Sequence, residues 1–203
     1  PAISVSYSSS AGNGVLGMGW SISAGACSIH RCAPTVAQDG KTGSVTFTIE
    51  DRLCLDGQKL VLVDGPDYWA NGAEFRTEID SYARIRRVGS TYEVQTRDNR
   101  LLTYGQAVQL SNSPLAELAH KLTLEQDASG NAVEYHYLTA GNGEVLLDYI
   151  EYTKGFASVA DHRRVEFSYK DRCAGSSAAA CLAGDPQDRA VSYVGGYPVW
   201  QTK

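Results

Sequence analysis

The chain has 203 residues, of which 43% are hydrophobic and 20% are charged, and its net charge is −5. This composition is typical of a folded globular protein and unlike that of a disordered segment. Acidic and basic residues are interleaved rather than gathered into a basic stripe, which argues against nucleic acid as a partner, and no apolar run is long enough to span a bilayer.

The first residues predict a β-hairpin. Apolar residues alternate with serines over 3–8, and bulky residues alternate with glycine or serine over 16–23, which is the period of extended strands. Ser8–Gly14 lies between them and is turn material. The nearly bare glycine and serine face of the second strand predicts that a backbone or a large side chain packs closely against it.

The same stretch contains the pattern G-x-G-x-x-G at residues 12–17, which is typical of dinucleotide-binding sites. That fingerprint needs a helix that begins inside the motif and an acidic residue about 20 positions later. Here the period of two continues, and Arg31, Cys32 and Ala33 occupy the region where the acid is needed. A tight turn is therefore the favoured interpretation.

Alternation continues along the chain. It predicts further strands at residues 45–49, 53–55, 60–63, 75–79, 82–88, 145–152, 165–169 and 191–199, with turn-like residues at 33–42. No window longer than about ten residues has a helical period. We therefore expect an all-β fold of antiparallel hairpins and meander that form twisted sheets, with very little helix.

We expect residues 1–203 to form a single β-rich module, with a sub-boundary near 64–72. Pro1 is not a natural start, so the chain is interpreted as a piece of a longer one.

Two hairpins can be given a register from their patterns. In the first, the apolar positions Tyr92, Val94 and Thr96 face Leu102 and Tyr104 if the loop is odd, which predicts a three-residue turn at 98–100. In the second, the apolar positions 118, 120, 122 and 124 face 133, 135 and 137 if the loop is even. This predicts a four-residue turn at 127–130.

Five cysteines give an odd count: Cys27, Cys32, Cys54, Cys173 and Cys181. Cys173 and Cys181 flank a loop of small residues that a disulfide can close, and Cys32 with Cys54 forms a second candidate pair, which leaves Cys27 free. The alternative is a zinc site built from Cys27, His30, Cys32 and Cys54. It lacks a C-x-x-C knuckle, so we expect disulfides or buried thiols and no metal.

No residue cluster spells out a reaction. The sequence has neither a G-x-S-x-G elbow nor an H-E-x-x-H motif. Glu74, Glu78 and Asp80 share one side of a strand, and a solvated strand face is the simplest interpretation. His120 is interpreted as a hydrogen-bonded sheet residue. We therefore expect neither catalytic residues nor a cofactor.

A glycan-binding module is the alternative function. Its candidate surface aromatics are Tyr68, Trp69 and Trp200. Aromatic residues in strands are more often cross-strand packing pairs, and this is the simpler interpretation.

Four segments appear in a characteristic order: GNGVLGMGWSIS, SIHRC, AQDG and DRLCLDGQKL. Together they resemble the N-terminal region of the SpvB-like family, which includes the B components of insecticidal toxin complexes and related Rhs or YD-repeat proteins. Later segments, RDNRLLTYG, DASGNAVEYHY and YVGGY, resemble YD-repeat hairpins more loosely.

The resemblance implies a secreted toxin or virulence protein. In that family this region is β-structure at the start of a large Rhs-type shell, which in toxin complexes encloses a toxic C-terminal segment and docks partner subunits. The namesake's ADP-ribosylation belongs to a separate domain, whose E-x-E motif is absent here. We therefore expect a non-catalytic structural module whose partners are the rest of its own chain and toxin-complex subunits.

Overall fold

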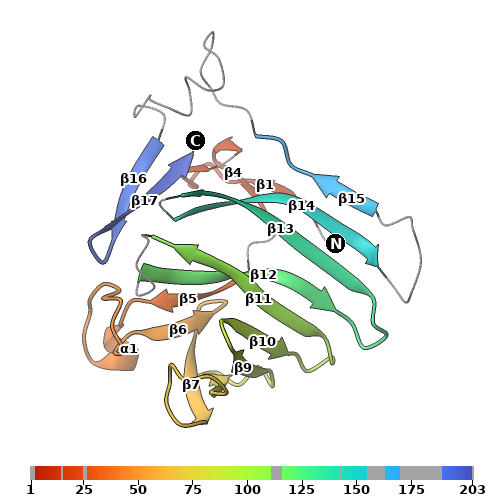
Figure 1. Ribbon diagram of the computed structural model, residues 1–203. Coiled ribbons are helices and arrows are strands. Elements are labelled where there is room, and N and C mark those ends of the chain that lie inside the picture. The colour runs from red at the N-terminus through yellow and green to blue at the C-terminus, as the bar shows by residue number, and fades with distance from the viewer. Residues whose placement is uncertain are drawn as a thin grey trace.

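The computed structural model describes residues 3–14, 16–24, 27–110, 116–141, 143–154, 163–169 and 189–202. Within these ranges the chain forms antiparallel strands and one single-turn helix, α1 (Val36–Asp39). The predicted all-β fold is therefore confirmed (Figure 1).

Eight consecutive strands form a closed ring, in which each strand is antiparallel to the next. They are β5 (Ser28–Cys32), β6 (Arg52–Leu55), β7 (Gln58–Asp64), β8 (Glu74–Thr77), β9 (Arg84–Val88), β10 (Thr91–Gln95), β11 (Leu101–Gln109) and β12 (Glu117–Gln126). The ring closes where β12 returns to pair with β5, with His120 opposite Ile29. Segment 64–72, where the sequence suggested a boundary, joins β7 to β8 within the ring.

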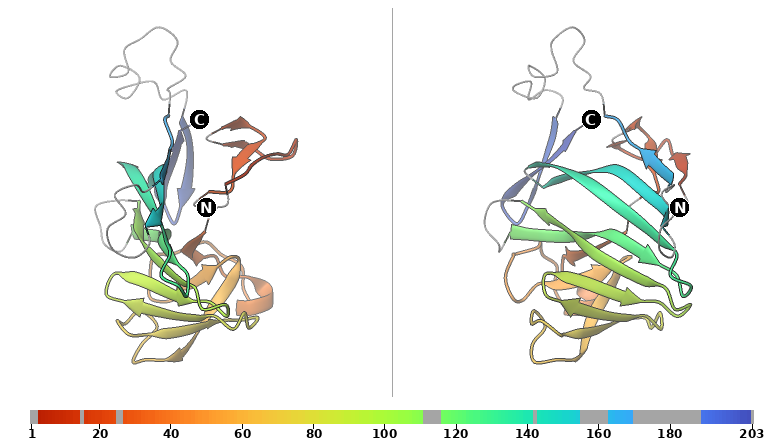
Figure 2. Two further views of the ribbon diagram at one scale, coloured as in Figure 1. Left: turned by 90° about the vertical axis from the view of Figure 1, so that its right-hand side faces the viewer. Right: turned by 45° about the vertical axis from the view of Figure 1, so that its right-hand side comes forward.

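Strand β12 also carries the rest of the sheet. One of its edges pairs with β11, and the other is shared between β5 and β13 (Ala132–Gly141). From there β14 (Glu144–Lys154) and β15 (Arg163–Glu166) extend the sheet away from the ring (Figure 2). The fold therefore combines a closed part with an open one.

Two small hairpins lie outside this sheet. The N-terminal one pairs β1 (Val5–Tyr7) with β4 (Trp20–Ile22) and includes β2 (Asn13–Gly14) and β3 (Gly17–Met18). The C-terminal one pairs β16 (Arg189–Val194) with β17 (Tyr197–Thr202). A single strand was predicted over 191–199, and this is wrong because Gly195 and Gly196 take positive φ angles of 55° and 86° and turn the chain back.

The core fills the ring and continues under the open strands. Its buried members are Ile29, Leu53, Leu55, Leu60, Ala73, Phe75, Ala83, Ile85, Tyr92, Val94, Tyr104, Leu122, Tyr135, Leu147 and Ile150. Tyr92 and Tyr104, which are each 1% exposed, are opposite one another on β10 and β11. Burial raises the pKa of Tyr92 to about 12, so its hydroxyl stays neutral.

The register predicted for the first hairpin is confirmed, since Tyr92 pairs with Tyr104 and Val94 with Leu102. The turn has three residues as expected but lies at 97–99, one position earlier than predicted. Asn99 explains the difference, because its φ of 60° supplies the left-handed residue that ends such a turn.

The even loop predicted for the second hairpin is wrong. Leu124 is opposite Glu134, and the Asp127 amide donates to the Asn131 carbonyl, so the turn is the three-residue segment 128–130 with Gly130 at a φ of 85°. The prediction assumed that residues 118–124 pair with residues 133–137 along their whole length. The pairing of β12 with β13 covers only 124–126, because the preceding part of β12 is paired with β5.

Segment 45–49 was predicted as a strand and forms a loop instead. The Asp51 carboxylate accepts hydrogen bonds from the Thr46 amide at 3.0 Å, the Thr46 hydroxyl at 2.7 Å and the Phe47 amide at 2.7 Å. In a β-strand, successive amides point to opposite sides, so two neighbouring amides that bind one carboxylate cannot both belong to a strand. Phe47 also has a φ of 56°, which is outside the range of extended backbone.

Arg31 completes this arrangement from strand β5. Its guanidinium lies 3.0 Å from the Asp51 carboxylate and donates to the Glu117 carbonyl at 2.9 Å, and both side chains of the pair are at most 10% exposed. It also stacks over the Trp69 ring at 4.2 Å. One buried ion pair thus ties the first and last strands of the ring to two of its loops.

We expect Asp51→Asn to lower the free energy of unfolding by about 3 kcal/mol, because the buried Arg31 guanidinium loses its counterion. Urea unfolding followed by fluorescence measures this loss. An unchanged midpoint and slope would show that the pair does not hold the loops.

Burial alone would raise the pKa of Asp51, but hydrogen bonds from Thr46 and Phe47 and the charge of Arg31 hold it below its usual value. The stabilisation is therefore present above the unfolded-state pKa of about 3.9 and is lost as the pH falls through the folded-state pKa. Stability measured from pH 6 to pH 2 should fall more steeply in the native chain than in Asp51→Asn. Parallel curves would contradict this assignment.

Candidate functional site

The three carboxylates that the sequence placed on one side of a strand, those of Glu74, Glu78 and Asp80, interact with other residues of the chain. A hydrogen bond from Arg84 at 2.6 Å, with the charges of Arg84 and Arg76, holds the pKa of Glu74 below its usual value. Glu78 accepts a hydrogen bond from Gln38, and Asp80 accepts one from the Tyr82 amide at 2.8 Å. The structure therefore gives each of the three a local structural partner.

His120 is the buried sheet residue that the sequence predicted. It is 3% exposed, its Nε2 lies 2.7 Å from the Glu117 carboxylate, and its ring meets Tyr92 edge to face.

Cys32 and Cys54 form a disulfide with an S–S distance of 2.04 Å, which joins neighbouring strands β5 and β6. Because both sulfurs are bonded to each other, the alternative zinc site with Cys27 and His30 is not formed. Cys27 is exposed and carries a free thiol. The other predicted pair, Cys173 with Cys181, lies outside the described residues.

Of the predicted surface aromatics, the two whose side chains the structure describes, Tyr68 and Trp69, do not form an exposed platform. The Tyr68 hydroxyl accepts a hydrogen bond from the Leu53 amide and donates one to the Leu60 carbonyl, and Trp69 Nε1 donates to the Ile49 carbonyl at 3.0 Å. Both rings pack against the core and are partly buried. This differs from the prediction because the 65–72 loop folds back over the ring. The side chain of Trp200 is outside the described residues.

The G-x-G-x-x-G motif forms a turn within the N-terminal hairpin. Asn13 pairs with Met18 and Gly14 with Gly17, so extended residues stand where a dinucleotide site needs a helix. The close packing predicted for the glycine face is also found. A Cβ on Gly19 would lie 2.6 Å from the Tyr7 ring and 2.8 Å from the Ser8 carbonyl oxygen.

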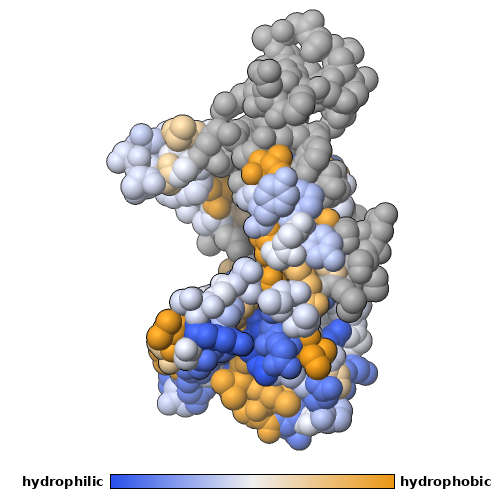
Figure 3. Space-filling view, turned by 90° about the vertical axis from the view of Figure 1, so that its left-hand side faces the viewer, coloured by the Kyte–Doolittle hydropathy of each residue, from blue (hydrophilic) through white to orange (hydrophobic). Residues whose placement is uncertain are grey.

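The described residues of 3–24, which we call the N-terminal arm, expose an apolar surface. Val5 is 56%, Tyr7 59%, Met18 69% and Trp20 45% exposed. The arm projects from the rest of the molecule at the upper left of Figure 3 and stands apart from the sheet in Figure 2. Serine hydroxyls hydrogen-bond across its other face, at 3.0 Å between residues 4 and 23 and 2.8 Å between 6 and 21.

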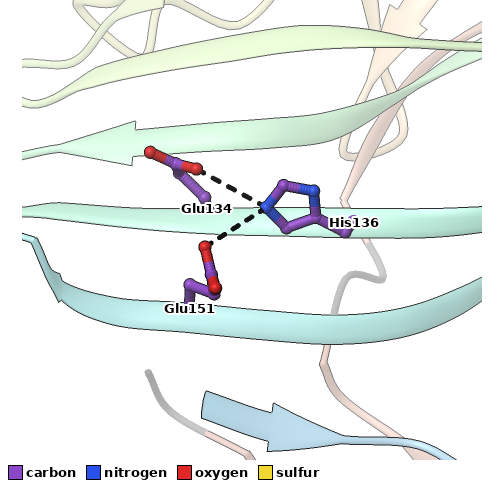
Figure 4. Close-up of side chains that lie close together, drawn as sticks. All are labelled: Glu134, His136 and Glu151. Carbon is purple, nitrogen blue, oxygen red and sulfur yellow. Dashed lines mark ion pairs between the residues drawn. The ribbon is translucent and has the colours of Figure 1, made fainter. Parts of the chain in front are cut away.

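A second cluster was not predicted from the sequence. Glu134 and His136 on β13 and Glu151 on β14 bring two carboxylates and one imidazole together (Figure 4). The sequence pattern contained a partial signal, since residues two apart on a strand share a face. Placing Glu151 opposite Glu134 also required the register of β13 on β14, which shifts at two points between the turn and this pair, at 136/137 and 139/141.

The fold matches solved structures over the whole chain. The N-terminal domain of effector protein SpvB from Salmonella typhimurium aligns with a TM-score of 0.71 at 16% identity, covering 100% of this chain and 79% of that one. The chain has the fold of the SpvB N-terminal domain. The resemblance predicted from the sequence is thereby confirmed at the level of structure.

Toxin-complex structures match similarly. TcdB2-TccC3 aligns with a TM-score of 0.71 at 18% identity, and a Photorhabdus luminescens Tc holotoxin pore with 0.70 at 17%. Each match covers all of this chain but only 12% of the other. No protein-family model matches the sequence, and a search of curated proteins finds no match. Among the described helices, none has the length and apolar character needed to cross a membrane.

We expect the double variant Cys32→Ser, Cys54→Ser to lose about 3 kcal/mol of unfolding free energy, because the bond closes a loop between residues separated by 22 positions. Urea unfolding under oxidising conditions measures the loss. Cys27→Ser is the matched control and should unfold like the native chain. A double variant as stable as this control would show that the bond contributes nothing.

Proposed function

We propose that this chain is a non-catalytic structural module of a secreted toxin protein, and that it contributes strands to a larger β-shell or docks a partner subunit. The observation that carries the proposal is the N-terminal arm. It places Val5, Tyr7, Met18 and Trp20 in solvent on a hairpin that extends away from the ring. Several large apolar side chains exposed on one small hairpin are typical of a protein–protein contact.

The size of the arm supports the same conclusion. Strands β1 and β4 have three residues each, and a two-stranded hairpin of that length is at best marginally stable in water. Contact with further chain would bury its apolar side chains and hold it in place. We infer that residues 1–203 are one module of a longer chain and that this chain supplies the contact.

The open end of the sheet offers a second attachment point. Among the described strands, β15 is last in the sheet order, so its outer edge has backbone groups ready to pair with an added strand. Extending a sheet in this way is how a shell wall would grow from the module.

The comparisons with solved structures support a role for this fold as one part of a larger toxin protein. The same architecture occurs in an effector protein and as 12% of the much longer chains of toxin complexes. The Cys32–Cys54 disulfide favours a secreted protein, because such bonds persist in oxidising compartments.

A shell role requires no catalytic group, and Glu74, Glu78 and Asp80 already have structural partners. Since Tyr68 and Trp69 are hydrogen-bonded within the chain, we make no separate proposal of glycan binding.

Hydrogen exchange of this chain alone and within its longer parent protein tests the proposal. We expect amides of residues 4–8 and 19–23 to exchange at least tenfold more slowly in the parent, because the arm is buried there. The ring hairpin 92–104 is the internal control and should exchange equally in both. Equal exchange of the arm would overturn the proposal.

A matched pair of variants separates docking from folding. Trp20→Ser should leave the stability of the isolated chain within about 0.5 kcal/mol, because the residue is exposed, and should restore fast exchange to the arm in the parent. Val61→Ser replaces an apolar residue of similar exposure, 48%, on the ring and should leave the arm protected. Protection that survives Trp20→Ser would show that the apolar face is not the contact.

A further inference from the structure

Three potential metal ligands meet on β13 and β14, in the open part of the sheet and away from the N-terminal arm. Glu134 and His136 are two residues apart on β13 and share a face, and Glu151 is directly opposite Glu134 on β14. His136 Nε2 lies 3.5 Å from the Glu134 carboxylate and 3.8 Å from that of Glu151, and one ligand atom from each of the three lies within 4.8 Å of the others (Figure 4).

The imidazole is held in place, but within the described ranges its Nε2 atom has only the two long ion-pair contacts with Glu134 and Glu151 and makes no hydrogen bond. The His136 ring stacks on Tyr149 with 4.2 Å between centroids and 13° between planes, and the Arg164 guanidinium lies 5.0 Å from the centre of the same tyrosine ring. Nε2 is buried and has no hydrogen-bond partner among the described residues. Since buried polar atoms rarely lack a hydrogen bond, Nε2 has room for a closer partner than the two carboxylates.

A metal ion fits the gap between these groups. Zinc binds imidazole nitrogen and carboxylate oxygen at about 2.0–2.2 Å, which places neighbouring ligand atoms of a tetrahedral site about 3.3 Å apart. The distances of 3.5 and 3.8 Å from Nε2 are close to that value and longer than good hydrogen bonds. All three ligand atoms lie within 4.8 Å of one another, so one ion can reach each of them if the side chains move inward.

The ligand types select the class of ion. Imidazole suits first-row transition metals, whereas Mg²⁺ and Ca²⁺ prefer sites made of oxygen alone. One imidazole with two carboxylates therefore favours Zn²⁺ over the two alkaline-earth ions.

We propose that Glu134, His136 and Glu151 form a Zn²⁺ site that joins β13 to β14 outside the closed ring. Three protein ligands leave a fourth tetrahedral position for water or for a group from a docked chain. A shallow groove of about 450 Å³ adjoins the site where β13 separates from β12, and both Glu134 and His136 line it. The proposal uses none of the residues of the N-terminal arm, so it stands or fails independently of the proposed function.

Nitrogen NMR of the imidazoles tests the site directly in the 203-residue chain. Zn²⁺ added to one equivalent, after treatment with a chelator, should move the Nε2 resonance of His136, which His136→Gln identifies by its disappearance. A Cys27→Ser background removes the exposed free thiol as a competing ligand. Mg²⁺ at the same concentration should cause no shift. A His136 resonance that is unmoved by zinc, or zinc shifts confined to other histidines, would overturn the proposal.

Thermal unfolding gives a second readout. At a free zinc concentration about 100 times the dissociation constant, the melting temperature should rise by roughly 5–10 °C. His136→Gln and Glu151→Gln should each weaken binding more than tenfold, and Glu93→Gln on β10 is the matched carboxylate control that should bind as the native chain does. Near-native melting without zinc would establish that the variants fold. Equal zinc affinity in all of them would contradict the assignment of ligands.

Discussion

The buried pair of Arg31 and Asp51 is the interaction on which the rest of the structure depends. Arg31 is on the first strand of the ring and donates to a carbonyl of the last, so it lies at the seam where the ring closes. Asp51 uses its remaining oxygen lone pairs to fix the loop at 45–49, and the Trp69 ring covers the guanidinium. A charge removed from water in this way is tolerated only when every partner is present, so the seam and the two loops form together or not at all.

This closed part explains how the molecule can hold open features without losing its fold. The ring contains most of the buried side chains and the disulfide, and it needs no outside partner to satisfy its strand edges. The N-terminal arm, the β13–β15 strands and the Glu134 cluster all lie outside it. In physical terms the chain separates the closed, buried part that gives stability from the exposed elements, and the proposed role in a larger assembly would use the latter.

Period-two alternation was enough to predict the fold class, the N-terminal hairpin and the register of the 92–104 hairpin, because local pattern and tertiary burial agree there. It failed where a single side chain overrides the pattern. Asp51 draws two adjacent amides out of an apparent strand, and the shared edge of β12 ends a hairpin that looks long in sequence. The resemblance carried by residues 12–60 led to the right fold. The cluster of Glu134, His136 and Glu151 depends on a bulged cross-strand register, which alternation does not determine.

The most direct test of the account is the structure of the complete parent protein, determined by electron cryomicroscopy. The account predicts that the apolar side chains of the N-terminal arm lie against other parts of the parent or a partner subunit, and that an added strand pairs with the outer edge of β15. A map in which the ring is well ordered while the arm and the β15 edge both face solvent would contradict it.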